Sequence, residues 1–190
     1  KPSDKILIHN AAGGVGQAAI QIAQSIGAEI YATAHPNKWG FLRANGIKHV
    51  YSSRDQLFKD QIKNDTNGAG VDVILNSLNG EFVDNSVSIL KNGGRFCEIG
   101  KLNVWDEEKF SKERPDAEFY MYDLSEIDEK GISALLHEIM SMVKKNDISV
   151  LPVKEFRIND AEKAMRFIQQ AKHIGKLSLV FDNNKEIQLY

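Results

Sequence analysis

Short apolar segments alternate with longer amphipathic segments along the first three quarters of the chain. The apolar segments are rich in β-branched residues and stop at turn-forming residues, which predicts strands at Ile6–His9, Glu29–Ala34, His49–Tyr51, Val71–Asn76, Arg95–Ile99 and Glu118–Met121. The segments between them predict helices at Val15–Ser25, Asn37–Asn45, Gln56–Asn64, Glu81–Lys91 and Lys130–Lys144. This alternation indicates an α/β fold, a doubly wound parallel six-stranded sheet covered by helices on both faces.

The pattern changes after residue 146. It predicts an extended segment, a helix and a final strand, at Val150–Phe156, Asp160–Ala171 and Lys176–Phe181. These elements do not continue the repeat of the first sheet. We therefore expect one domain over residues 1–146 and, over residues 147–190, a C-terminal segment that returns to a neighbouring domain. Its last residues, 182–190, are polar, and we expect them to be loosely held.

A glycine-rich turn joins the first predicted strand to the first predicted helix. The turn reads Asn-Ala-Ala-Gly-Gly-Val-Gly over residues 10–16. The order strand, glycine turn, helix brings backbone N–H groups and a helix N-terminus against a pyrophosphate, and glycine leaves room for that approach. The sequence therefore predicts a dinucleotide site of the Rossmann type, with phosphate contacts from Ala12, Gly13, Gly14, Val15 and Gly16. The alternative is a plain strand-to-helix turn of another α/β protein.

The second predicted strand does not end in the acidic residue that NAD-binding proteins place on the ribose hydroxyls. Residues 31–38 contain no Asp or Glu, and Glu29 comes too early in the strand to reach a ribose. Donors or positive charge for a 2′-phosphate are offered instead by Thr33, His35, Lys38 and, after the third strand, Arg54. This pattern favours NADPH over NADH, and the alternative is that the basic residues are solvated surface side chains.

Further blocks of sequence resemble one group of oxidoreductases. The blocks are Ile8–Gln21, Lys38–Trp39, Phe41–Arg43, Ser52–Arg54, Asp72–Leu78, Gly80–Phe82, Gly93–Lys101, Tyr122–Leu124 and His173–Lys176. Together they resemble the enoyl reductase domain of type I polyketide synthases, related to that of animal fatty acid synthase. That domain belongs to the zinc-independent, quinone-reductase-like medium-chain dehydrogenase/reductases. The resemblance covers almost the whole chain, including Ala11 in place of the first glycine of the general motif.

The resemblance implies a reaction and its partners. It implies NADPH-dependent reduction of a 2,3-enoyl thioester on an acyl carrier protein, with neighbouring synthase domains in the same polypeptide. Enzymes of this family build the active site between the nucleotide domain and an N-terminal substrate domain, which this sequence lacks. The chain starts at Lys1 without a methionine, as a piece of a longer protein would. We expect it to bind cofactor and to be incomplete for turnover.

Two polar residues are expected at the carboxyl edge of the sheet, where ligands bind in such folds. Lys101 follows the fifth strand through Gly100, and Asp123 follows the sixth strand. In the resembling reductases the matching lysine and aspartate are candidate proton donors, which implies catalytic roles for Lys101 and Asp123. The alternative is an ordinary surface salt bridge, which adds little stability.

Other residues of this edge are expected near the cofactor. Asn76, Ser77 and Leu78, together with Gly100, are predicted to border its ribose and nicotinamide, although Ser77 is also a typical residue for capping the next helix. Lys176 is predicted to approach the phosphates from the returning strand, or else to face solvent.

Composition excludes several classes of function. The charge is nearly balanced, with 24 basic and 26 acidic residues, which gives no footprint for nucleic acid or a membrane surface. We see no membrane-spanning run and no secretory leader. The single cysteine, Cys97, fits a cytoplasmic protein and excludes a multi-cysteine zinc lobe. His9 and His173 lack metal-ligand spacing, so we expect no metal and assign both to core or loop roles.

Rival functions remain open at this stage. A free-standing quinone or alkenal reductase shares the fold and NADPH but differs in acceptor. A non-catalytic nucleotide-binding module, such as a redox sensor or a decayed domain, binds the nucleotide without the reaction. A methyltransferase is disfavoured because it needs an acid after the second strand. A short-chain reductase is disfavoured because the sequence contains no Tyr-x-x-x-Lys.

Overall fold

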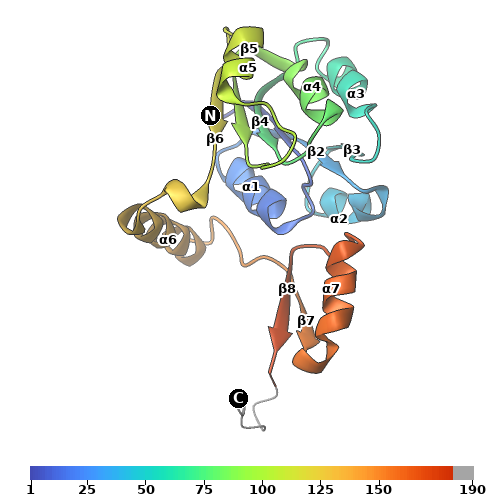
Figure 1. Ribbon diagram of the computed structural model, residues 1–190, viewed down its shortest axis with the longest axis vertical. Coiled ribbons are helices and arrows are strands. Elements are labelled where there is room, and N and C mark those ends of the chain that lie inside the picture. Colours follow the sequence, from blue (N-terminus) through green and yellow to red (C-terminus); the bar gives the residue numbers. More distant parts are fainter. Residues whose placement is uncertain (182–190) are drawn as a thin grey trace.

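A computed structural model of the chain describes residues 1–181, so the predicted loose tail at Asp182–Tyr190 lies outside the described residues. One parallel six-stranded sheet has the order β3-β2-β1-β4-β5-β6 (Figure 1). Its strands are β1 (Lys5–Ile8), β2 (Glu29–Ala34), β3 (His49–Ser52), β4 (Val71–Asn76), β5 (Leu90–Glu98) and β6 (Glu118–Met121). The predicted doubly wound six-stranded sheet is confirmed. Because the strand order reverses between β1 and β4, the ligand crevice of such a sheet lies beyond the carboxyl ends of these strands.

Helices cover both faces of this sheet, and alternation along each strand divides the core accordingly. The helices of this part are α1 (Gly14–Ser25), α2 (Trp39–Ala44), α3 (Phe58–Asp65), α4 (Glu81–Val87), α5 (Glu107–Glu113) and α6 (Glu129–Lys144). Leu7 of β1 belongs to one buried cluster with Phe58 of α3 and Phe110 of α5. Its neighbour Ile8 belongs to a second cluster with Ile20 of α1 and Leu42 of α2. Both clusters are continuous apolar cores on opposite faces of the sheet.

Most predicted boundaries shift by one to three residues. The strand predicted over Arg95–Ile99 begins five residues earlier, at Leu90, and the helix predictions need two corrections. The helix predicted over Glu81–Lys91 ends at Val87, because the chain enters β5 at Leu90, which pairs with Val71 of β4. The helix α5 was not predicted. Its start is fixed by Asp106, whose side chain accepts a hydrogen bond from the backbone N–H of Lys109 at 2.8 Å.

The C-terminal elements form a second, separate sheet. Strands β7 (Val153–Arg157) and β8 (Lys176–Val180) pair in parallel, and α7 (Ala161–Gln169) connects them. This unit lies below the main sheet in Figure 1 and confirms that the repeat does not continue. One of its contacts with the main domain is the bond that the backbone N–H of Gly175 donates to the carbonyl of Ala12 at 3.0 Å. The domain boundary at residue 146 stays a prediction.

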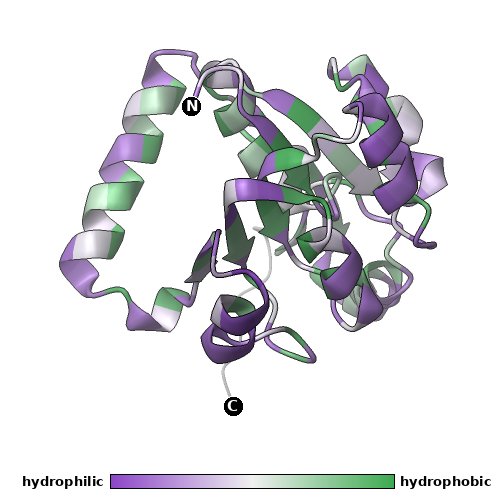
Figure 2. Cartoon of the chain, turned by 90° about the horizontal axis from the view of Figure 1, so that it is seen from above, coloured by the Kyte–Doolittle hydropathy of each residue, from purple (hydrophilic) through white to green (hydrophobic). Residues whose placement is uncertain are grey.

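Helix α6 differs from the other helices of the first domain. All its residues are half-buried or exposed, and Figure 2 shows it standing apart from the strands. The same figure shows the hydrophobic residues concentrated in the sheet. Within residues 1–181 no helix is both long enough and apolar enough to cross a bilayer.

Candidate functional site

The glycine turn after β1 packs directly against the start of α1. A Cβ atom on Gly16 would lie 2.5 Å from Cα of Ala11 and 2.7 Å from the carbonyl oxygen of Asn10. Helix α1 has Gly13 at its N-cap, with no side-chain cap and no acidic residue in its first turn. The first N–H groups of α1 are therefore available to donate to a ligand, and the helix dipole favours an anion there. The turn at residues 12–16, the candidate phosphate cradle, has the predicted strand–turn–helix geometry. The N–H of Gly13 donates to the carbonyl of Asn10 at 2.9 Å, and phosphate binding by this turn stays a prediction.

Lys176 of β8 crosses this cradle. A Cβ on Gly14 would lie 2.8 Å from Cδ and 2.9 Å from Nζ of Lys176, so the lysine stem rests on Gly14. Within residues 1–181 the ammonium forms neither a hydrogen bond nor an ion pair. Since a helix N-terminus carries partial positive charge, a lysine ammonium beside it is favourable only when an anion lies nearby. This arrangement supports the predicted approach of Lys176 to phosphates.

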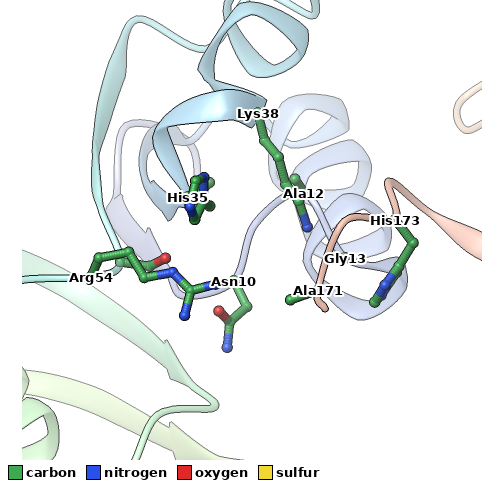
Figure 3. A pocket seen from close by; sticks show the side chains of 10 residues that line it. Asn10, Ala12, Gly13, His35, Lys38, Arg54, Ala171 and His173 are labelled. Carbon is green, nitrogen blue, oxygen red and sulfur yellow. The ribbon is translucent and has the colours of Figure 1, made fainter. Parts of the chain in front are cut away.

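A pocket of about 320 Å³ opens beside the cradle (Figure 3). Of the predicted cofactor-binding residues it is lined by Ala12, Gly13, His35, Lys38 and Arg54. Sequence reasoning missed the others, Asn10, Ala34, Ser53, Ala171 and His173. The last two come from the segment between α7 and β8, which no local sequence signal placed beside the glycine turn.

The pocket lining contains cationic residues and no carboxylate. Burial lowers the pKa of Lys38, and the neighbouring positive charge of Arg54 lowers it further. Burial also lowers the pKa of His173, with a further contribution from Lys38. Like charges held together without an acid favour an anionic ligand, because the anion relieves their repulsion. The lining therefore fits a phosphate group better than a ribose hydroxyl pair.

Thr33 does not lie in this pocket, contrary to the expectation from sequence. Its side chain is fully buried, and its hydroxyl lies 2.9 Å from Nδ1 of His9. Nε2 of His9 lies 2.8 Å from the hydroxyl of Ser86, which itself donates to the carbonyl of Phe82. Burial lowers the pKa of His9 to about 3, so this ring is neutral. The Thr33–His9–Ser86 network is a core element beneath the turn, and it confirms a core role for His9.

A second cluster lies at the carboxyl ends of β4 and β5. Asn76 is fully buried, and its Nδ2 donates to Oε2 of Glu98 at 2.7 Å and to the carbonyl of Leu78 at 2.9 Å. The backbone N–H of Gly100 donates to Oε1 of Glu98 at 2.6 Å. The Glu98 carboxylate therefore accepts hydrogen bonds from the end of β4 and from the loop after β5, and so joins them. Burial raises its pKa, while the bonds from Asn76 and the backbone oppose that shift.

The bonds of this cluster give Asn76 and Ser77 other partners than those predicted. The Asn76 amide is committed to Glu98 and Leu78, so its side chain positions the loop rather than facing a cofactor. Ser77 does not cap the next helix, since the N-cap of α4 is Gly80. The Ser77 hydroxyl instead accepts a bond from Asn10 at 2.9 Å, which joins this loop to the glycine turn. The sequence analysis did not assign Glu98 to the site. A charged residue within an apolar strand was the only sign of its special role.

The structure brings the two predicted proton donors together. Nζ of Lys101 donates to Oδ2 of Asp123 at 2.6 Å, and the other carboxylate oxygen accepts from the backbone and hydroxyl of Ser125. Lys101 is half exposed, with 53% of its side chain accessible. The bond from Lys101, followed by the bonds from Ser125, holds the pKa of Asp123 far below its usual range. Asp123 is therefore a carboxylate at neutral pH and has no proton to donate, and the catalytic role of the pair stays a prediction.

Comparison with known proteins gives the family. The model of the family described as zinc-binding dehydrogenase matches residues 45–179. The chain is 43% identical to polyketide synthase GfsB of Streptomyces halstedii over 94% of its length, which is 3% of that protein. It is 45% identical to the CurK enoyl reductase, with a TM-score of 0.90, over 96% of this chain and 56% of the other.

A third relative is a piece of similar extent. The nucleotide-binding subdomain of the enoylreductase domain of PpsC from Mycobacterium tuberculosis is 39% identical with a TM-score of 0.71, over 80% of this chain and 88% of that one. The chain therefore belongs to the zinc-binding dehydrogenase family and, within it, to the enoyl reductase domains of polyketide synthases. Among the described residues, no group of three or more His, Cys, Asp or Glu is placed to hold a metal ion.

Proposed function

We propose that this chain binds NADPH and forms the cofactor-binding part of an enoyl reductase that acts on a 2,3-enoyl thioester. The observation that carries the proposal is a pocket that adjoins the start of α1, is lined by Lys38, Arg54 and two histidines, and has no carboxylate in its lining. The family supports the reaction, because the relatives that match over most of this chain include enoyl reductases.

The residues of the site divide between the parts of the cofactor. The N–H groups at the start of α1 and the Lys176 ammonium suit the diphosphate. Lys38, Arg54 and His35 suit the 2′-phosphate that distinguishes NADPH. The loops that Glu98 joins suit the nicotinamide end, where Leu78 and Gly100 lie at the edge of the sheet. When bound, NADPH supplies the hydride that adds to the β-carbon of the enoyl group.

The pair of Lys101 and Asp123 fits the proton that completes the reduction. Hydride addition leaves negative charge on the thioester oxygen, which an ammonium stabilises, and the α-carbon then needs a proton. Lys101 carries that proton at Nζ. Asp123 orients the ammonium through a 2.6 Å bond and stays ionised, so it acts as a positioning residue for Lys101.

The substrate, partners and domain limits belong to the proposal as well. An acyl carrier protein would present the thioester, and neighbouring synthase domains would lie in the same polypeptide, as the size of GfsB suggests. Residues 1–146 would form the nucleotide domain, and residues 147–190 would return to a substrate domain. A cytoplasmic location and the absence of a bound metal remain predictions.

Direct titration tests the cofactor, and turnover tests the acceptor. We expect this chain to bind NADPH with at least about tenfold higher affinity than NADH, since a sheltered charge-assisted bond to the 2′-phosphate contributes that much. Fluorescence of the reduced cofactors measures both constants. Equal affinities would remove the argument from Lys38 and Arg54. The longer polypeptide that contains this chain should then reduce an enoyl thioester, and a preference for quinones would identify the rival reductase instead.

A further inference from the structure

His173 lines the pocket, whereas the sequence analysis gave it only a core or loop role. It comes from the segment between α7 and β8 and lines the same pocket as Gly13 and Lys38 (Figure 3). Its ring nitrogen Nδ1 is enclosed by protein and has no hydrogen-bond partner among residues 1–181. Enclosed polar atoms without a partner are rare and unfavourable, because the atom loses water and gains nothing. The residue also lines the pocket, so a ligand that bonds to the ring once it turns about its Cβ–Cγ bond would remove that penalty.

The segment that carries His173 is attached to the phosphate cradle. Two residues further on, the N–H of Gly175 donates to the carbonyl of Ala12 at 3.0 Å, and Gly175 forms a parallel bridge with Gly13. The next residue, Lys176, donates its N–H to the carbonyl of Pro152 at 2.9 Å. The backbone that carries the ring is therefore held beside the pocket before any ligand arrives, which lowers the ordering cost of binding.

The charged groups around the ring are all cationic. Lys38 faces it from the turn after β2, with His35 just before; Arg54 lies in the loop after β3. Lys176 follows His173 at the start of β8, and Lys172, which directly precedes His173, is exposed. Burial, followed by the charge of Lys38, lowers the pKa of His173, so the ring of the free pocket is mostly neutral at pH 7. An anion bound among these groups reverses both effects, because it favours the protonated imidazole.

We propose that His173 is a further phosphate ligand of the dinucleotide, which donates a hydrogen bond to a phosphate oxygen and takes up a proton as that phosphate binds. This inference rests on the proposed function. The phosphate is either the 2′-phosphate or the diphosphate, and both present the same oxygen acceptors. The proton comes from solvent, so binding of NADPH through His173 strengthens as the pH falls.

Three variants of this chain test the proposal by cofactor titration between pH 6 and pH 8. His173→Gln removes the titrating group, and His173→Phe keeps a flat ring without nitrogen. His137→Gln is the matched control, because His137 is exposed on α6 and bonds only to the carbonyl of Ser133. Each variant is first compared with the wild type by circular dichroism and thermal unfolding, so that a folding defect is recognised.

We expect both His173 variants to bind NADPH about tenfold or more weakly than the wild type at pH 6, and the control to bind normally. The ratio of variant to wild-type Kd should shrink toward pH 8, because proton uptake then contributes less. This ratio cancels every pH effect that the wild type and the variant share. A loss confined to NADPH assigns the bond to the 2′-phosphate, and an equal loss for NADH assigns it to the diphosphate.

Other outcomes overturn the proposal. A folded His173→Gln protein whose NADPH affinity follows the wild type at every pH would show that the ring binds no phosphate. Wild-type affinity in His173→Phe would reduce the residue to a packing surface. If the wild type binds neither nucleotide, the proposed function fails first and this inference fails with it, and that result is separate from any variant.

Discussion

The contact between the glycine turn and α1 makes a sharp prediction for Gly16→Ala. The new Cβ would lie 2.5 Å from Cα of Ala11 and 2.7 Å from the carbonyl oxygen of Asn10. Carbon atoms in contact are normally separated by about 3.5–4 Å, so the turn and the helix must move apart by roughly 1 Å. Both neighbours are backbone atoms, which no side-chain rotation can move away.

The magnitude follows from two opposing effects. Overpacking typically costs about 1–3 kcal/mol, whereas alanine in a helix gains up to about 1 kcal/mol over glycine. We expect a net loss of about 1–2 kcal/mol in the free energy of unfolding, or about 2–4 °C in Tm for each kcal/mol in a chain of this size. Because the displaced N–H groups form the phosphate cradle, the affinity for NADPH should fall about tenfold or more.

Gly40→Ala is the matched control for this substitution. Gly40 lies in α2, and a Cβ there would meet no atom within 4 Å. The control should therefore keep wild-type NADPH affinity and gain up to about 1 kcal/mol of stability. Urea unfolding and cofactor titration of the three proteins measure both quantities. Wild-type stability and affinity in Gly16→Ala would refute the reasoning, since the turn would then have yielded without penalty.

Three further predictions concern single residues. Lys38→Ala should weaken NADPH binding about tenfold while leaving NADH unchanged, and titration with both cofactors checks this, equal losses counting against a 2′-phosphate contact. Lys101→Ala in the longer polypeptide should slow enoyl reduction about 10²-fold or more without weakening NADPH binding, and wild-type turnover would leave Lys101 a structural role. The third concerns His9, whose pKa falls from 6.5 unfolded to about 3 folded. Its contribution to stability is therefore complete above pH 6.5 and lost as the pH falls toward 3, by roughly 2–3 kcal/mol between pH 6.5 and 4.5. Urea unfolding should show this slope in the wild type and a flatter one in His9→Gln, and parallel slopes would contradict it.

The sheet could be predicted from sequence because its signals are local. The strands alternate with amphipathic segments, and the turn at Gly13, Gly14 and Gly16 marks the strand-to-helix junction without any long-range information. Local signals fail where tertiary pairing decides. The last turn predicted for α4 is strand instead, because Leu90 pairs with Val71 across the sheet. Helix α5 is short, and its strongest signal is one cap, Asp106.

The candidate site likewise contains residues that could be predicted from sequence and residues that could not. Lys38 and Arg54 follow strands that are neighbours in the sheet, so their common edge could be inferred from strand order. The pairing of Lys101 with Asp123 could be inferred likewise, since β5 and β6 are adjacent. His173 could not, because its position depends on a contact between two separate sheets. Thr33 was assigned to the cofactor because its residue type fits, but strand alternation turns it inward to His9.

The bridge between Gly13 and Gly175 has a practical consequence for anyone who trims this polypeptide. A truncation at the apparent end of the six-stranded sheet would retain every element of the nucleotide fold and delete Ala171 and His173 from the pocket wall, together with the lysine that crosses Gly14. If the proposed function holds, such a shortened protein would lack one wall of the pocket and bind the dinucleotide more weakly. Where the sheet stops is thus a poor guide to where the binding unit stops.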